Sequence, residues 1–178
     1  KVSNPGISTM VRKTTATGSW TDGHSAENGM AVYEGGGYTY CLRVESAKDT
    51  ETKGIVLYDF LESYVLSDAE EGYTDVQAKK NWQGDWQGAG QWQGSLSSVD
   101  VSEFLTAGAE PVVYYATLAD ITTRQLISSG NYDLSADIWQ KAQLNSAGQW
   151  NVPEGLKVSA IAIDAGKDTN GEAFSLEA

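Results

Sequence analysis

The residues Tyr38–Glu62 constrain the fold of this chain more than any other stretch. Over the first eight of them, YTYCLRVE, side chains alternate between two sides of an extended backbone, and one side holds Tyr38, Tyr40, Leu42 and Val44. Residues 46–53 are polar, and the short apolar run Gly54–Asp59 follows. A run of this length, rich in β-forming residues, is too short for a typical helix. The pattern predicts two strands joined by a solvated turn, which together form a β-hairpin.

Further strands and two short helices are expected along the chain. Apolar or β-branched runs predict strands at Ile7–Lys13, Met30–Glu34, Val112–Thr117 and Leu156–Ala165. Pro111 is expected to open the third of these, and Asn170-Gly171 predicts a turn before a terminal strand that begins near Phe174. Asp100 or Ser102 is expected to cap a helical turn that ends at Gly108. Leu134 and Ile138, four residues apart, indicate a second short helix within Asn131–Lys141 that carries Trp139.

The predicted hairpin also resembles part of a known family. Its Tyr-x-Tyr-x-Leu-x-Val strand, polar turn and Ile-Val-Leu-Tyr-Asp-x-Leu-Glu run are similar to repeat domains of large cell-wall-anchored surface proteins of Gram-positive bacteria. Later pieces are similar to the same family in the same order, namely Val99–Ser102, Gly108–Tyr115 and Val158–Asp164. The resemblance implies an Ig-like β-sandwich that serves in a stalk or an adhesive arm.

The same resemblance implies a covalent crosslink. Many such stalk domains form an amide between a lysine on the first strand and an asparagine or aspartate on a late strand, assisted by a buried carboxylic acid. Burial makes such an amine neutral and nucleophilic while the acid keeps a proton to shuttle. In this chain the resemblance points to Lys13 as the lysine, Asp59 as the assisting acid and Asp164 as the only carboxyl inside the late strand. Asn170 lies in a predicted turn, which departs from the strand-borne asparagine of the family.

A glycine-rich segment with three Trp-Gln-Gly units supplies the second candidate site. Trp82, Trp86 and Trp92 offer flat rings, and Gln83 and Gln87 offer hydrogen-bonding amides, which together suit a sugar ring or a peptide. Gln93 and Asp85 add to the polar groups. The alternative is that the rings fold back as a lid over the end of the sandwich. A binding platform needs at least two exposed and roughly coplanar rings, whereas a lid buries them.

Composition excludes several classes of function. With 24 Asp and Glu against 12 Lys and Arg, the formal net charge is -12, which argues against binding to a phosphate backbone. Cys41 is the only cysteine and is expected to be a small buried hydrophobe, so there is no intrachain disulfide. Because His24 is the only histidine, a Ser-His-Asp triad or a zinc site is not expected.

Two uses of clustered carboxylates stay open at the level of sequence. A glycosidase needs only a pair of acids across a sugar site, and 24 acids always leave that option. Asp164, Asp168 and Asn170 loosely resemble a calcium loop, although the acidic residue that closes a 12-residue loop is missing. An ordinary polar turn is the alternative at this place.

Taken together, the sequence predicts one all-β domain, an Ig-like β-sandwich over residues 1–178 with one or two short helices and a Trp/Gly-rich insertion at about 66–95. We expect a non-catalytic structural or adhesive repeat of an extracellular protein on the bacterial cell surface, with no cofactor and no metal. The expected partners are neighbouring domains of the same chain and a glycan or protein ligand, but not nucleic acid, and no stretch is long enough to span a membrane. A carbohydrate-binding module and, less favoured, a carboxylate-pair enzyme are the alternatives.

Overall fold

The computed structural model describes residues 6–13, 35–46, 51–61, 95–117 and 133–176. These residues are mostly β, in several antiparallel sheets with one short helix. The chain divides into two compact units, of which unit 1 comprises Lys1–Lys53 with Ser175–Ala178 and unit 2 comprises Gly54–Phe174. The single domain stays a prediction, and residues 66–94 of the expected insertion lie outside the described part.

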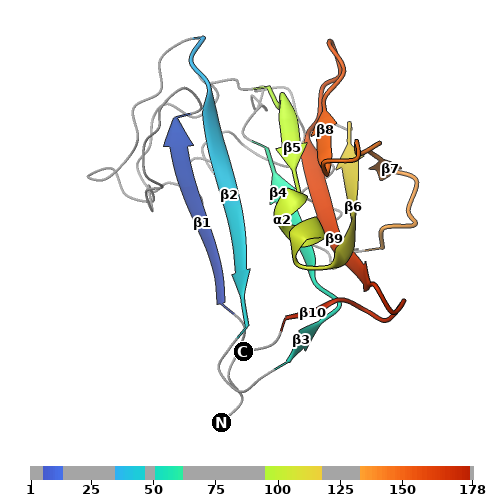
Figure 1. The fold of residues 1–178 in the computed structure, drawn as a ribbon. Helices are drawn as coiled ribbons and strands as arrows, with labels where there is room; N and C mark the ends of the chain where they lie inside the picture. The colour runs from blue at the N-terminus through green and yellow to red at the C-terminus, as the bar shows by residue number, and fades with distance from the viewer. Residues whose placement is uncertain (1–5, 14–34, 47–50, 62–94, 118–132, 177–178) are drawn as a thin grey trace, which may run out of the picture. The chain divides into compact units, whose positions relative to one another are not determined.

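Unit 1 contains two antiparallel strand pairs (Figure 1). β1 (Gly6–Lys13) pairs with β2 (Tyr38–Glu45) along its whole length, from Gly6 opposite Glu45 to Lys13 opposite Tyr38. β3 (Thr52–Lys53) pairs with β10 (Ser175–Leu176). The strand predicted at the start of the chain is therefore confirmed.

The strand predicted at Tyr38–Glu45 is confirmed, but its burial does not alternate as expected, because Tyr40 is exposed whereas Thr39 on the other side is half-buried. The rings of Tyr38 and Tyr40 lie 5.1 Å apart at 89°, an edge-to-face contact between side chains that share one face of the strand. Cys41, however, is only half-buried, so the expectation of a fully buried small hydrophobe was wrong. The reason is that β2 belongs to a two-stranded sheet, which offers little surface under which a side chain can be enclosed.

Unit 2 is built on a four-stranded antiparallel sheet in the order β4-β9-β6-β7 (Figure 1). Its strands are β4 (Val56–Phe60), β9 (Ala160–Asp168), β6 (Ala109–Ala116) and β7 (Gln140–Lys141). β9 has a partner on both sides, and its residues 160–163 are all buried, which accounts for the unbroken apolar run in the sequence. A second antiparallel pair joins β5 (Ser98–Asp100) to β8 (Gln149–Asn151).

The strand register assigns the core residues to two faces of this sheet. Ala162 pairs with Tyr58 on one side and with Tyr114 on the other, and Ala160 pairs with Ala116. One face of the sheet therefore carries small side chains at its centre, and we call Ala116, Ala160 and Ala162 the alanine floor. Trp139 packs on these buried alanines, and partly buried residues surround the cluster, namely Val56, Tyr58, Tyr114, Leu134, Ala136 and Ile138. The other face carries Leu57, Ile161, Ile163, Val113 and Tyr115. There Tyr115 stacks on Trp150 of β8, with ring centroids 4.8 Å apart.

The predicted central hairpin was wrong in its pairing, although both of its strands exist. β2 pairs with β1, and β4 pairs with β9, which lies about a hundred residues further along the chain. Part of the predicted turn, Thr52–Lys53, is itself the strand β3. Local pattern identifies a strand but carries no information on its partner, because any strand with an apolar face gains from covering it against any other.

Of the two expected helices, the first is present and the second is not. The N-cap of α2 (Ser102–Thr106) is Val101 and no side chain caps the helix, so the expected cap by Asp100 or Ser102 was wrong. Asp100 Oδ1 instead accepts the Ser102 N–H at 2.9 Å in the turn before the helix, and Gly108 ends the helical turn with φ +85°. Residues 133–139 form consecutive turns instead of a helix, with N–H to carbonyl hydrogen bonds from Ala136 to Asp133 and from Trp139 to Ala136. The short irregular path brings both Ile138 and Trp139 to the alanine floor.

A β-bulge explains where Pro111 and Gly166 stand. β6 begins at Ala109, so Pro111 lies inside the strand and does not open it as expected. Glu110 faces both Lys167 and Gly166, and Gly166 has φ +72°. A Cβ at this glycine would collide with the Glu110 carbonyl, so the close approach requires glycine. Beyond the bulge β9 runs on to Asp168, three residues further than the predicted strand.

The predicted terminal turn is confirmed, but the strand that follows it pairs with β3 instead of completing a hairpin. Gly171 has φ +83°, its N–H donates to the Asp168 carbonyl at 3.0 Å, and Lys167 bridges to Ala173. The strand after the turn begins at Ser175 and pairs with β3 of unit 1. The segment Gln149–Pro153, expected to be a connector, contains the strand β8.

Candidate functional site

The proposed ring platform lies outside the described residues. Trp82, Trp86 and Trp92, with Gln83 and Gln87, fall in residues 62–94, as His24 falls in 14–34. Whether these rings are exposed or buried therefore stays a prediction. The candidate chemistry that can be placed consists of the crosslink residues and the carboxylates of unit 2.

The crosslink residues fall on three strands. Lys13 ends β1 opposite Tyr38, Asp59 lies in β4 opposite Ile161, and Asp164 lies in β9 opposite Val56. Paired residues share a face and neighbours along a strand alternate, so Asp59 and Asp164 occupy opposite faces of the sheet in unit 2. A crosslink with Asp164 as acceptor would consequently need an assisting acid other than Asp59. The crosslink itself stays a prediction.

Four aspartates of unit 2 share one structural use. Each accepts, through Oδ1, the backbone N–H of the residue two positions further on, at 2.8 to 2.9 Å, and these residues are Asp100, Asp133, Asp164 and Asp168. Asn145 makes the same turn, with its Oδ1 accepting the Ala147 N–H at 3.0 Å. Such side chains replace a backbone acceptor at a chain reversal. One oxygen of each aspartate, Oδ1, is thus bound to the nearby backbone, in a turn for three of them and at the β9 bulge for Asp164.

The carboxyl pKa is lowered in three of these turns, those of Asp100, Asp133 and Asp168. At Asp168 desolvation raises the pKa, but hydrogen bonds from the backbone of Glu172 and Asn170 outweigh it. Hydrogen bonds from Ser102, first from its side chain and then from its backbone N–H, lower the pKa of Asp100, and Gln149 adds to the effect. The same two kinds of hydrogen bond from Ser135 lower the pKa of Asp133. Donors that point at a carboxylate stabilise its charged form. All three groups are therefore anionic over the physiological pH range.

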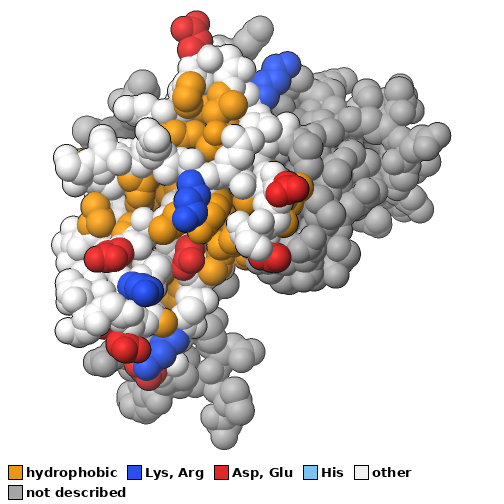
Figure 2. Space-filling view, turned by 90° about the vertical axis from the view of Figure 1, so that its right-hand side faces the viewer, with side chains coloured by type: hydrophobic (Ala, Val, Ile, Leu, Met, Phe, Trp, Pro, Cys, Tyr) orange, Lys and Arg blue, Asp and Glu red, His pale blue; other side chains and the backbone are white. Residues whose placement is uncertain are grey.

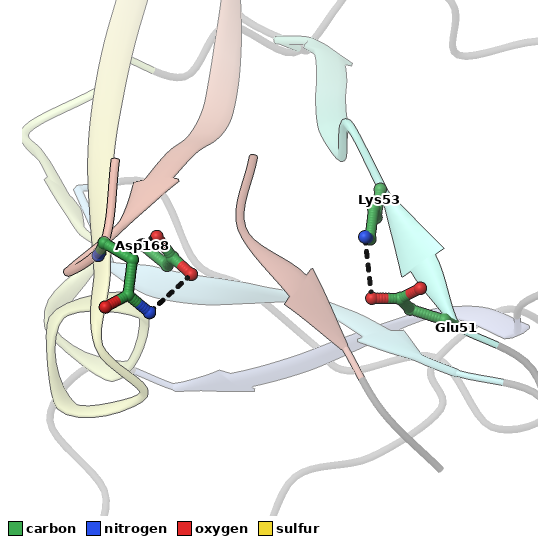
Figure 3. Close-up of polar contacts among 4 residues, drawn as sticks. Glu51, Lys53 and Asp168 are labelled. Carbon is green, nitrogen blue, oxygen red and sulfur yellow. Dashed lines mark hydrogen bonds and ion pairs between the residues drawn. The ribbon is translucent and has the colours of Figure 1, made fainter. Parts of the chain in front are cut away.

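The residues of the possible calcium loop are engaged with one another. Asp168 Oδ1 accepts the backbone N–H groups of Asn170 and Glu172, and the Asn170 side-chain amide lies 3.4 Å from Asp168 Oδ2 (Figure 3). Asp164 binds the Gly166 N–H within its own strand. Among the described residues no group of three or more metal-ligating side chains gathers. The arrangement is that of a polar turn.

A polar and aromatic strip near the ends of β6, β7 and β8 was not predicted from the sequence. The Tyr115 hydroxyl donates to Gln140 Oε1 at 3.0 Å, and Gln149 Nε2 donates to Asp100 Oδ2 at 3.0 Å. These partners are 25 and 49 residues apart in the chain, so only the strand register brings them together. The one signal in the sequence was the two-residue alternation around Trp150, whose polar neighbours face outward. Each hydrogen bond joins two neighbouring strands, β6 to β7 or β5 to β8, and the Tyr115–Trp150 stack is the contact that links the second strand pair to the sheet.

Trp139 is the buried polar group without a partner in the described part of the chain. Its side chain is 7% exposed and its Nε1 makes no hydrogen bond there. The indole lies 5.8 Å from the Tyr58 ring, at a tilt of 58°. A buried N–H of this kind costs on the order of 1–3 kcal/mol. Shape and apolar contact therefore hold Trp139 in place.

Charges on the described surface are mixed in sign. Figure 2 shows one face on which single lysine or arginine side chains stand among acidic and apolar ones. Lys141 Nζ lies 5.7 Å from the centre of the Tyr114 ring, an exposed cation–π contact. In the described residues, no helix has both the length and the apolar character needed to cross a bilayer.

Comparisons of the chain with protein-family models, with curated proteins and with solved structures returned no match.

Proposed function

We propose that this chain is a non-catalytic structural or adhesive domain, displayed outside the cell as part of a bacterial surface protein. One observation carries the proposal: of the five pieces that resemble surface-protein repeats, the four from Ile55 onward lie in unit 2, whereas the Tyr38–Val44 strand lies in unit 1. The pieces around Ile55, Gly108 and Val158 contain β4, β6 and β9, which are neighbours in one sheet. These three pieces are distant in the chain but adjacent in the sheet, as expected when the resemblance reflects a common fold.

The proposed Ig-like sandwich is supported by the packing of unit 2. The pair β5–β8 contacts one face of the four-stranded sheet through Tyr115 and Trp150. Two antiparallel sheets packed face to face are what a sandwich requires. A scaffold in which four of the described aspartates bind the nearby backbone suits a structural domain without turnover.

The test of this function combines a binding assay with an assay for turnover. Immobilised domain is exposed to a panel of host matrix proteins and of plant, mucin and cell-wall glycans, and each glycan is then assayed for new reducing ends. The expected result is no increase in reducing ends, with either saturable binding or none. New reducing ends that depend on the domain would overturn the non-catalytic proposal and favour a carboxylate-pair enzyme.

A carbohydrate-binding module is the second candidate, favoured by the Trp-Gln-Gly units of the sequence. Tryptophan fluorescence is titrated with the same glycans in the wild type and in Trp82→Ala and Trp92→Ala variants. A saturable shift that is lost in these variants would establish the module. The matched control is Trp139→Phe: because Trp139 is buried, this variant should keep the shift. No shift with any glycan would leave a spacer or a protein-binding domain.

A further inference from the structure

The chain enters and leaves unit 2 through two strands that are paired with each other. β3 ends at Lys53, immediately before unit 2 begins, and β10 begins at Ser175, immediately after unit 2 ends. Lys53 lies opposite Ser175 and Thr52 lies opposite Leu176. Unit 2 is therefore an insertion whose two connections are held together by this short pair, which we call the β3–β10 clasp.

Burial differs sharply between the two units. Among the residues whose side chains the structure describes, every buried one lies between Ile55 and Phe174, inside unit 2. In β2, β3 and β10 each residue is intermediate or exposed. Isolated two-stranded pairs are marginally stable, and regions with few buried apolar contacts open first. From the described residues we expect the strands of unit 1 to open at a lower free energy than the four-stranded sheet of unit 2.

When the chain is pulled by its two ends, the direction of the strands also favours opening of unit 1 before unit 2. The load reaches the β1–β2 pair at Gly6 opposite Glu45, and it reaches the clasp at Thr52 opposite Leu176. In both cases an antiparallel pair is pulled apart from one end, so the load falls on a single residue pair at a time. The ion pair Lys53–Glu51, at 3.0 Å (Figure 3), is exposed and lies within one edge of the clasp. Such surface pairs add little.

From these observations we propose that the β3–β10 clasp is a mechanical bypass: while it holds, load on the chain ends does not pass through unit 2, and it opens before unit 2 unfolds. The chain then lengthens in two stages, with a weak first stage and a strong second one. This order follows from topology and burial whether or not the domain serves adhesion.

The test is single-molecule extension of the full chain, held at residues 1 and 178. Opening of the β1–β2 pair should release the chain between Gly6 and Glu45, about 130 Å, at low force. Unit 2 should follow at higher force and release about 400 Å less the distance between its folded ends. A single release of the whole length, or release of the longer segment first, would overturn the proposal.

A cysteine pair then tests the clasp itself. In a Cys41→Ser background, Lys53→Cys with Ser175→Cys places thiols on directly opposed residues, a geometry suited to a disulfide. When oxidised, this variant should lose the longer release and keep the shorter one at unchanged force, and reduction should restore the longer release. If the first release also moves to higher force, unit 1 and the clasp open as one with unit 2 and the proposal fails.

The matched control closes a loop inside unit 2. Tyr114→Cys with Lys141→Cys joins β6 to β7, and its disulfide should shorten the longer release by about 90 Å without changing the first. Hydrogen exchange on the unsubstituted chain gives an independent reading. The amides of Tyr38–Glu45 should exchange at lower denaturant than those of Ala160–Asp168, whereas exchange of both strands in one cooperative step would contradict the proposal.

Discussion

At the scale of single residues, side chains and backbone strain fix the turns of this protein. Aspartates at the starts of turns accept backbone N–H groups two residues on, and Gly166 occupies a bulge that no larger residue could enter. These effects are local, so most of them are readable from short sequence patterns. The exception is Gly166, because the Glu110 carbonyl that excludes a side chain there comes from another strand.

Substitution of Gly166 by alanine should strongly destabilise the protein. A left-handed conformation costs about 1–2 kcal/mol for an L-residue, and the collision with Glu110 adds to it, so we expect a loss of about 3 kcal/mol or more. Urea denaturation followed by circular dichroism measures the change. Gly155→Ala is the control, since Gly155 has φ +79° and open space around it, and should cost about 1 kcal/mol. Equal losses in both variants would show that the collision is relieved.

The turn at Asp100 should make the free energy of unfolding depend on pH in the acidic range. Its carboxyl pKa is lowered from 3.8 by hydrogen bonds from Ser102 and Gln149. A lowered folded-state pKa means that the stabilising contribution is complete above the unfolded-state pKa and is lost as pH falls through the folded value. Asp100→Asn should thus be less stable than the wild type at pH 7, and the two free energies of unfolding should converge below about pH 4. Parallel curves down to pH 2 would contradict this.

At the scale of elements, small side chains on one strand make room for a large one from a distant segment. Ala116 of β6 with Ala160 and Ala162 of β9 are 0% exposed, and the Trp139 ring packs on them beside Tyr58 and Tyr114. The consecutive turns of residues 133–139 place this ring, which a regular helix was wrongly expected to carry. The order of the sheet was equally beyond local pattern, since β4 pairs with β9 and not with β2.

Truncation at Trp139 should separate the role of its volume from that of its N–H. Trp139→Ala leaves a cavity over the alanine floor and should cost about 3–5 kcal/mol in the free energy of unfolding. Trp139→Phe keeps most of the contact and removes a buried N–H that has no partner in the described residues, so it should cost roughly 1 kcal/mol. Urea titrations at pH 7 measure both. A phenylalanine variant as unstable as the alanine one would show that the N–H is bound.

At the scale of the whole molecule, charge and topology set the behaviour of the chain. A formal net charge of -12 keeps molecules apart at neutral pH, and the sequence isoelectric point is about 4.3. The division into two units adds a second property, because both chain ends belong to unit 1 and unit 2 is inserted between β3 and β10.

Solubility should therefore pass through a minimum near pH 4.3. Self-repulsion vanishes where acidic and basic charges balance, and association is then limited only by surface polarity. Turbidity and light scattering across pH 3 to 8 measure this, and added salt at pH 7 should lower the second virial coefficient by screening. A protein that stays equally soluble at its isoelectric point would show that charge is not what keeps it dispersed.

The sequence by itself determined the β character of the chain, six of its strands, the helical turn after Asp100 and the turn at Gly171. Each of these depends on neighbours within a few residues, through the spacing of apolar residues or a positive φ. Only the tertiary structure decided which strands pair, how Trp139 is seated, why Gly166 is a glycine, and that Asp59 and Asp164 face opposite ways. The physical reason is that strand pairing and packing join residues from 25 to more than 100 positions apart, and their energy depends on surfaces that no local pattern encodes.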